Sequence, residues 1–376
     1  MSSLSTTHSR NRQRAQRKPS GRLAVPFLIC SFLGAGAAMK AQQQPKPSAE
    51  SKEVTVYATA RDKHGKIVAN LKKENFALDE EGRPQTISTF ARGSDLPITL
   101  GLLVDTSLSQ RRLLEDERKS SYAFVDRVLR QDKDRAFLIH FDTEVELLRD
   151  LTASREKLQS AFALLQTAQQ DQADEGNPSD EHREQGAQLF DGIFLASNEL
   201  MKNRQGRKAI VIISDGVNKG SRESFEDAIE SAQRSDTAIY SILYSGEEPT
   251  EHAARHSHWG GDAGGIGWPG GGGASWPTDG GSSGGRARQY PQGDKADGKR
   301  NLERISTETG GRLFEISKKL TLDQVYTQIE EELTNQYILG YVPDNSTAAP
   351  GYHKINLTTN EKDVTLQARD GYYSEK

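Results

Sequence analysis

The feature that most constrains this chain is a nearly unbroken apolar run at residues 98–104, which a polar stretch, 105–109, follows at once. A run without polar alternation is typical of a strand that is buried on both faces. Such strands occur in parallel sheets whose two faces are covered by helices. We therefore expect the chain to contain an α/β domain with a mostly parallel central sheet.

Three further apolar runs support this expectation. Residues 136–141, 209–214 and 237–244 repeat the strand pattern, and apolar residues at helical spacing separate them. The helical patterns consist of Leu114, Phe124 and Val128, of Leu189, Ile193 and Leu200, and of Phe225 and Ile229. Strands that alternate with amphipathic helices predict a doubly wound, Rossmann-like sheet, in which ligands gather outside the carboxyl ends of the strands.

The segments that flank this region, 53–92 and 321–376, have a different character. Apart from a helical pattern at 322–333, apolar and polar residues alternate in them. The alternating stretches are 54–59, 337–342, 354–358 and 364–368. We expect a discontinuous, β-sandwich-like unit, built from both flanks, into which an α/β domain at 97–320 is inserted.

Two hairpins are expected in the first flank. One pairs residues 54–59 with 67–68, and the other pairs 76–78 with a strand that carries Ile87 and Phe90, across a turn at 80–84.

The N-terminal segment, 1–41, has the pattern of an export signal. Residues 1–22 carry six basic side chains and no acidic one, and apolar or small residues fill 23–38. This stretch is shorter than the ~20 residues of a spanning helix, so we expect cleavage near 38–41. A polar linker at 42–52 follows, and the mature protein is expected to be secreted, periplasmic or part of the cell envelope. An uncleaved membrane anchor is the alternative.

Charge and cysteine content exclude several classes of function. Without residues 1–41 the chain has 42 basic and 53 acidic residues, a formal charge of −11. A surface of this sign argues against a nucleic-acid partner. Cys30, the only cysteine, lies in the predicted signal, so the mature chain has no disulfide, thiolate metal site or cysteine nucleophile.

A Gly-rich stretch, 246–299, lacks apolar periodicity and is expected to be a flexible insertion. It contains His252, His256 and His258, but a zinc-protease motif would need Glu where Ala253 stands, so we interpret these histidines as solvated, with a weak zinc or nickel site as the alternative. Its three tryptophans are candidate partner anchors. Outside it, His140 is interpreted as a strand-end histidine with local partners, with a metal ligand as the alternative.

Polar residues after two of the predicted strands form a candidate metal site. Asp105, Ser107 and Ser109 follow the first strand, and Asp215 follows the strand at 209–214. If the two strands are neighbours, two carboxylates and two hydroxyls meet at one edge of the sheet. Such hard oxygen donors favour Mg²⁺, with Mn²⁺ or Ca²⁺ as alternatives. The plainer alternative is that Asp105 and Asp215 only cap turns and helix starts.

At these residues the chain resembles the von Willebrand factor type A (vWA) domain, over residues 97–316. Asp105, Ser107 and Ser109 match the first segment of that family's metal-ion-dependent adhesion site, and Asp215 matches the last. The resemblance implies that the hydroxyls bind the metal directly and that one Asp acts through water. It also implies a protein partner whose acidic residue completes the coordination shell.

The flanking segments resemble the vWA-related proteins of acidobacteria, and this similarity implies no known reaction. The matching motifs are the hairpin at 75–90, Thr309-Gly310-Gly311-Arg312, residues 336–341 and Gly371-Tyr372-Tyr373.

The middle segment of the site departs from the family pattern. The family has Gly-Gly-Thr-Ala-Leu-Tyr-Asp, whose Thr donates to the metal, whereas residues 185–191 read Gln-Gly-Ala-Gln-Leu-Phe-Asp. Ala187 cannot coordinate a metal. The site therefore binds metal more weakly, borrows Gln188 or a residue of the loop at 177–180, or has lost the metal.

Together these features predict an exported vWA-like module that binds a partner protein through a divalent metal. A structural or assembly subunit of an envelope complex, with a degenerate metal site, is the alternative, and a metal-dependent hydrolase is a third possibility. Neither Ser107 nor Ser109 lies in a Gly-x-Ser-x-Gly elbow, and no motif places a histidine as their base, so we expect no enzymatic activity. Membrane contact is expected only through an uncleaved N-terminal segment.

Overall fold

The computed structural model describes residues 53–93, 96–107, 114–165, 187–244, 292–344 and 350–374. Contacts divide the chain into residues 1–48 and 49–376, and every described residue lies in the second unit. The predicted signal and linker, Ser109, the loop at 177–180 and the histidines and tryptophans of the Gly-rich stretch lie outside the described residues.

A six-stranded sheet forms the centre of the inserted domain, in the order β10-β9-β8-β5-β6-β7. Its strands are β5 (Ile98–Asp105), β6 (Arg135–Phe141), β7 (Val145–Thr152), β8 (Arg207–Ser214), β9 (Ala238–Leu243) and β10 (Leu313–Glu315). All neighbouring pairs are parallel except β6 and β7. Every residue of β5 and β8 is buried, which confirms the predicted doubly wound, mostly parallel sheet.

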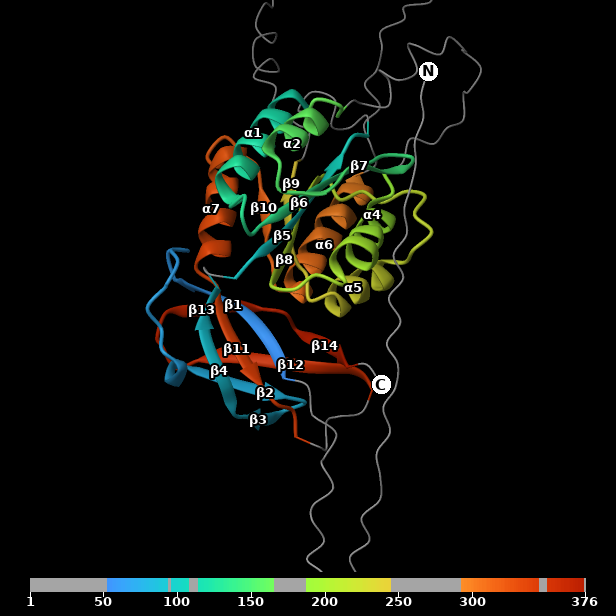
Figure 1. Cartoon of the computed structure of the whole chain (residues 1–376). Coiled ribbons are helices and arrows are strands. Elements are labelled where there is room, and N and C mark those ends of the chain that lie inside the picture. Colours follow the sequence, from blue (N-terminus) through green and yellow to red (C-terminus); the bar gives the residue numbers. More distant parts are fainter. Residues whose placement is uncertain are drawn as a thin grey trace, which may run out of the picture. The chain divides into compact units, whose positions relative to one another are not determined.

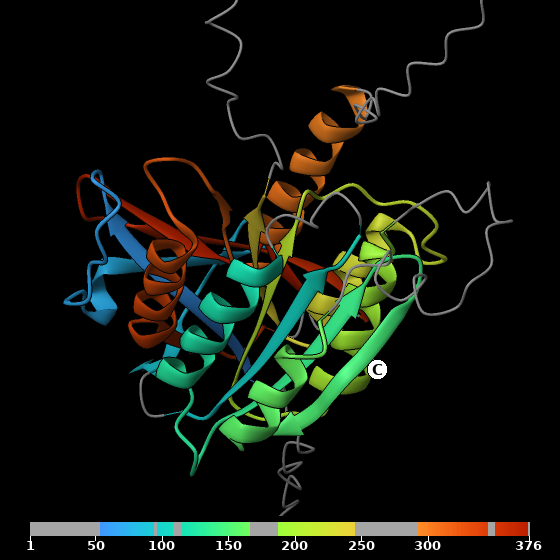
Figure 2. The same cartoon turned by 90° about the horizontal axis from the view of Figure 1, so that it is seen from above.

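Helices cover both faces of this sheet (Figures 1 and 2). On one face lie α1 (Leu114–Val128), α2 (Arg155–Phe162) and α7 (Leu322–Thr334). On the other lie α4 (Leu189–Leu195), which continues as a π-helical segment (Ala196–Met201), α5 (Phe225–Arg234) and α6 (Gln292–Thr309). Successive residues of the central strands point to opposite faces, so Leu102 packs under the first group of helices and Leu103 under the second.

Three features of this domain differ from the sequence prediction: strand β7, helix α2, which no predicted pattern covers, and the start of helix α6. Strand β7 was not predicted, because it is an edge strand whose alternation is interrupted by charged residues and whose register against β6 shifts. Helix α6 begins at Gln292, inside the range 246–299 that was predicted to be a flexible insertion. The early part of α6 is polar and contains Gly298, so it carries no apolar periodicity by which a helix could be recognised.

The flanking segments form two four-stranded antiparallel sheets, which confirms the discontinuous β unit. The sheet orders are β13-β1-β11-β4 and β14-β12-β2-β3. The strands are β1 (Val54–Asp62), β2 (Phe76–Glu80), β3 (Arg83–Gln85), β4 (Ile87–Arg92), β11 (Tyr337–Tyr341), β12 (Gly351–Thr359), β13 (Val364–Ala368) and β14 (Gly371–Ser374), with a short 3-10 helix at Lys73–Asn75. Both flanks contribute strands to each sheet.

The two predicted hairpins are only partly correct. β2 pairs with β3 around a tight turn at Glu81 and Gly82, whose φ angles are 51° and 74°, whereas β4 crosses to the other sheet and pairs with β11. Pro84 has no N–H to donate, which suits β3 to the edge of its sheet. The predicted strand at 67–68 is a single bridge between Ile67 and Arg61.

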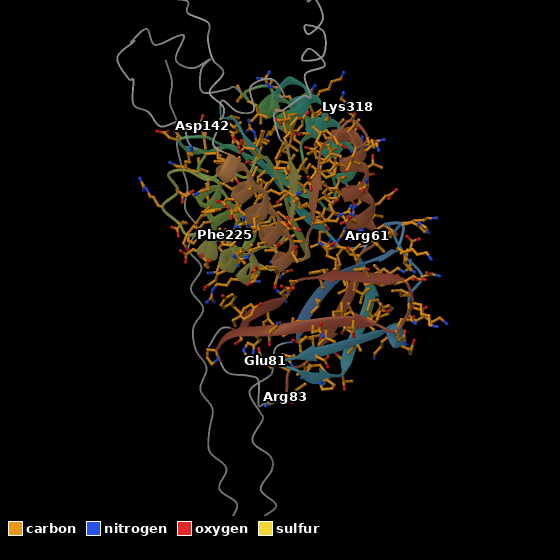
Figure 3. The ribbon with its side chains drawn as sticks, turned by 180° about the vertical axis from the view of Figure 1, so that it is seen from behind. Arg61, Glu81, Arg83, Asp142, Phe225 and Lys318 are labelled. Atoms are coloured by element: carbon orange, nitrogen blue, oxygen red, sulfur yellow. The ribbon has the colours of Figure 1, made fainter. Side chains whose placement is uncertain are left out.

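Short connections and buried charges join the inserted domain to the β unit. The N–H of Gly93, after β4, donates to the carbonyl of Gln336, before β11, at 2.8 Å. Arg61 of β1 and Arg312 both pair with Glu332 of α7, whose side chain is 2% exposed (Arg61 is labelled in Figure 3). The β unit therefore contacts the edge at which the central strands begin, and the predicted metal site lies at the opposite edge. No helix in the described part of the chain is long and apolar enough to cross a membrane.

Candidate functional site

Asp105 ends β5 and has no exposed surface. Its Oδ1 accepts the backbone N–H of Ser107 at 3.0 Å, and its Oδ2 accepts the hydroxyl of Ser214 at 2.6 Å. Ser214 is the last residue of β8, the strand that pairs with β5 in parallel. The carboxylate of Asp105 therefore bridges the carboxyl ends of the two central strands.

Asp215 follows β8 directly and is 9% exposed. Its Oδ1 accepts the N–H of Val217 at 3.0 Å, in a turn where Gly216 has a φ of +77°. A Cβ on Gly216 would lie 2.3 Å from the carbonyl oxygen of Gly298, so α6 is in close contact with this turn. The turn that holds Asp215 is thus confined by backbone on its α6 side.

The two carboxylates lie close enough to repel each other. Burial, and after it the charge of Asp215, raise the pKa of Asp105 to about 7, although hydrogen bonds from Ser107 and Ser214 lower it in part. An ionised Asp105 is therefore costly in the absence of a cation. This is the electrostatic setting in which a divalent cation binds favourably, because it offsets both charges.

The structure brings together three of the predicted ligands: Asp105, Ser107 and Asp215. Ser107 is 8% exposed and bonds to Asp105 through its backbone and side chain. Ser109 lies outside the described residues. Within the described ranges no group of three or more His, Cys, Asp or Glu could hold a metal, so a site here depends on serine hydroxyls. The donor set fits a hard cation such as Mg²⁺ that retains waters.

The middle segment is placed beside this edge of the sheet. Ala187 is buried, and its carbonyl accepts the N–H of Lys219, in the loop after β8. The backbone N–H of Gln188 donates to the carbonyl of Asp142, and its side-chain nitrogen donates to the carbonyl of Thr143 at 2.5 Å. The side chain of Gln188 thus lies over the turn between β6 and β7, where Asp142 is labelled in Figure 3.

His140 is engaged at both ring nitrogens. Its Nδ1 lies 3.0 Å from the hydroxyl of the buried Thr106, and its Nε2 lies 3.1 Å from Oε2 of Glu146. The prediction of a strand-end histidine with local partners is confirmed. Its contact with Thr106, between Asp105 and Ser107, also fixes the turn that carries the candidate ligands.

Two residues of the site were present in the sequence motifs but had no role assigned to them. Ser214 precedes Asp215 and bonds to Asp105, which a sequence does not reveal because it depends on strand order. Asp191, the last residue of the middle segment, accepts the backbone N–H groups of Arg222 and Glu223, in the loop after β8. An acidic residue in the first turn of a predicted helix was the available signal, but helix capping explains that signal equally well.

A doubly wound sheet with Asp-x-Ser at the end of one central strand and Asp at the end of its neighbour defines a vWA-type α/β domain. Residues 100–218 match the family model described as the von Willebrand factor type A domain, so this part of the chain is similar to that domain. No curated protein sequence matches the chain.

Solved structures of similar fold have low sequence identity to this chain. An aerotolerance-related membrane protein from Bacteroides fragilis is 17% identical, with a TM-score of 0.37 over 63% of this chain and 98% of its own. BatB from Bacteroides thetaiotaomicron is 14% identical, with a TM-score of 0.37 over 64% of this chain and 97% of its own. The minor pilin PilB from Streptococcus sanguinis is 11% identical, with a TM-score of 0.38 over 64% of this chain and 62% of its own.

Proposed function

We propose that this protein is an exported, non-enzymatic binding module that captures a partner protein through a divalent cation, Mg²⁺ in the first instance. Asp105, Ser107 and Asp215 hold the cation, together with Ser109. The cation supplies an open coordination position that accepts a carboxylate oxygen from the partner. The chain's own residues orient the cation and keep bulk water from the buried side of the site.

One observation carries the proposal: two carboxylates with little exposure share one edge of the sheet, and one of them is hard to ionise there without a cation. Turn capping alone does not require this arrangement, because each carboxylate could accept its local N–H without approaching the other. The vWA match over residues 100–218 adds support, since it includes all these residues.

Calorimetric titration of MgCl₂ into the purified protein tests the proposal. The wild type is expected to bind Mg²⁺ and the Asp105→Ala variant is not. Asp62→Ala is the control, because Asp62, like Asp105, accepts two hydrogen bonds, here from the backbone N–H groups of His64 and Lys66, but lies in a turn of the β unit. Binding heat that survives in Asp105→Ala, or is absent in the wild type, contradicts the proposal.

Ala187 favours a second candidate, a subunit of an envelope assembly in which the metal site is degenerate and the β unit makes the contacts. Its observation is that Ala187, at the position that supplies a donor in the family, has no oxygen in its side chain. Absence of Mg²⁺ binding in a folded wild-type protein would support this candidate.

The Ala187→Thr variant is expected to bind Mg²⁺ several-fold more tightly than the wild type. Threonine adds a hydroxyl donor at the buried position where the family pattern has one. The same titration measures the effect, and Ala187→Val, which has the same shape without the oxygen, is the control. Equal affinities of the Thr and Val variants would show that this position does not reach the cation.

A further inference from the structure

A set of hydrogen bonds ties the loop after β8 to the first turn of α4, and we call it the α4 clamp. Its members on the α4 side are Ala187, Phe190 and Asp191, and on the loop side Asn218, Lys219, Ser221, Arg222 and Glu223. The loop runs from Asp215 to α5, which begins at Phe225 (labelled in Figure 3). The clamp therefore acts on the segment that starts with a candidate metal ligand.

Asp191 makes the strongest contacts of the α4 clamp. Its Oδ1 accepts the N–H of Arg222 at 2.9 Å and of Glu223 at 2.8 Å, and its Oδ2 lies 3.1 Å from the first of these nitrogens. Hydrogen bonds to an ionised carboxylate are about twice as strong as neutral ones. One side chain of α4 thus holds two successive backbone amides of the loop.

The remaining hydrogen bonds of the α4 clamp also stabilise the loop against α4. Oδ1 of Asn218 accepts the N–H of Phe190 at 3.3 Å and the hydroxyl of Ser221 at 2.6 Å. The N–H of Lys219 donates to the carbonyl of Ala187 at 2.9 Å. The loop is therefore held along its length, by bonds that run in both directions between it and α4.

Asp215 lies at the start of this clamped loop. On one side its turn meets Gly298 of α6, where a Cβ on Gly298 would come within 2.6 Å of the carbonyl oxygen of Asp215. On the other side the loop is fixed by the α4 clamp. A carboxylate that is held in this way keeps its direction before any cation arrives, and preorganisation of this kind lowers the free energy lost on binding.

We propose that Asp191 is a positioning residue for the metal site, and that the segment 187–191 serves this site as a scaffold for Asp215 rather than as a ligand. The inference rests on the proposed function, because it concerns the same cation. It explains why the segment is hydrogen-bonded to the loop that starts with Asp215, although Ala187 offers no donor to a metal.

Titrations of Mg²⁺ and of Ca²⁺ into Asp191→Ala, Asp191→Asn and the Asp62→Ala control test the inference. Mg²⁺ demands near-ideal octahedral geometry, whereas Ca²⁺ tolerates irregular shells. Asp191→Ala is expected to raise the Kd for Mg²⁺ by about 10-fold or more, and that for Ca²⁺ by less. Asp191→Asn keeps one acceptor oxygen and is expected to fall between Asp191→Ala and the wild type.

The change in the ratio of the two Kd values separates positioning from general loosening of the fold. Equal weakening of both cations in Asp191→Ala, or an Mg²⁺ affinity that matches the Asp62→Ala control, overturns the role of Asp191 while the proposed function stands. A wild type that binds neither cation overturns the proposed function, and the role of Asp191 with it. Amide exchange at residues 222 and 223 confirms in each variant whether the α4 clamp has opened.

Discussion

The Asp105→Asn variant is expected to unfold at a higher temperature than the wild type at neutral pH without metal, and to lose Mg²⁺ binding. Asn fits the same space and can bond to Ser107 N–H through its oxygen and to the Ser214 hydroxyl through its nitrogen. It removes the buried negative charge that repels Asp215. The gain in the free energy of unfolding is expected to be roughly a few kcal/mol.

The pH dependence of stability follows from the same charge. The pKa of Asp105 is raised from 3.8 in a free side chain to about 7 in the fold, so the folded protein binds the proton more tightly than the unfolded chain. The metal-free wild type should therefore lose stability as the pH rises from about 4 to about 7, and this contribution should level off above that range. Asp105→Asn lacks this slope.

With Mg²⁺ the stability of the wild type is expected to rise with pH instead of falling, because the cation binds the ionised carboxylate and stabilises only the folded state. Thermal unfolding in EDTA and in MgCl₂, at several values between pH 5 and pH 8, measures both effects. A metal-free wild type whose stability rises steadily over this range, in parallel with the variant, would contradict the assignment.

Gly311→Ala is expected to lower the free energy of unfolding by about 3 kcal/mol or more, which corresponds to roughly 10 °C in Tm. A Cβ at this position would lie 1.9 Å from the carbonyl oxygen of Ile239 in β9, and backbone cannot move aside as a flexible side chain can. The residue stands between α6 and β10, so the substitution would force α6 away from the sheet.

Gly65→Ala is the matched control for this variant. Gly65 has a φ of +79° and nothing within 4 Å of an added Cβ, so its replacement costs only the strain of a left-handed alanine, about 1–2 kcal/mol. Equal losses of stability in the two variants would show that the contact with Ile239 is not the constraint on Gly311.

The central sheet could be predicted because its strands are buried on both faces. β5 and β8 contain apolar runs of strand length, which are typical of strands in a parallel sheet that is covered on both faces. β7 and α2 were not predicted, because they lie at the margin of the domain. Their faces are only partly covered there, so their sequences carry a weak apolar pattern. The crossing of β4 to the second sheet is set by long-range pairing with β11, which local pattern does not encode.

The ligands of the candidate site could be predicted from the sequence, but the residues that hold these ligands in place could not. Asp105 and Asp215 could be expected to meet, because both follow strands of one parallel sheet. The bond from Ser214 to Asp105 requires that β5 and β8 be neighbours, and the α4 clamp requires that α4 lie beside the loop after β8. These are facts of three-dimensional packing, and metal binding itself stays a prediction.

Arg92, the last residue of β4, pairs directly with Tyr337, the first residue of β11, in antiparallel register. The chain leaves the β unit after Arg92, forms the inserted domain and returns to the β unit at Tyr337. A two-residue turn, the shortest common hairpin connection, would be enough to join them. The entry and exit points of the inserted domain are therefore adjacent, and the insertion interrupts no strand of the β unit.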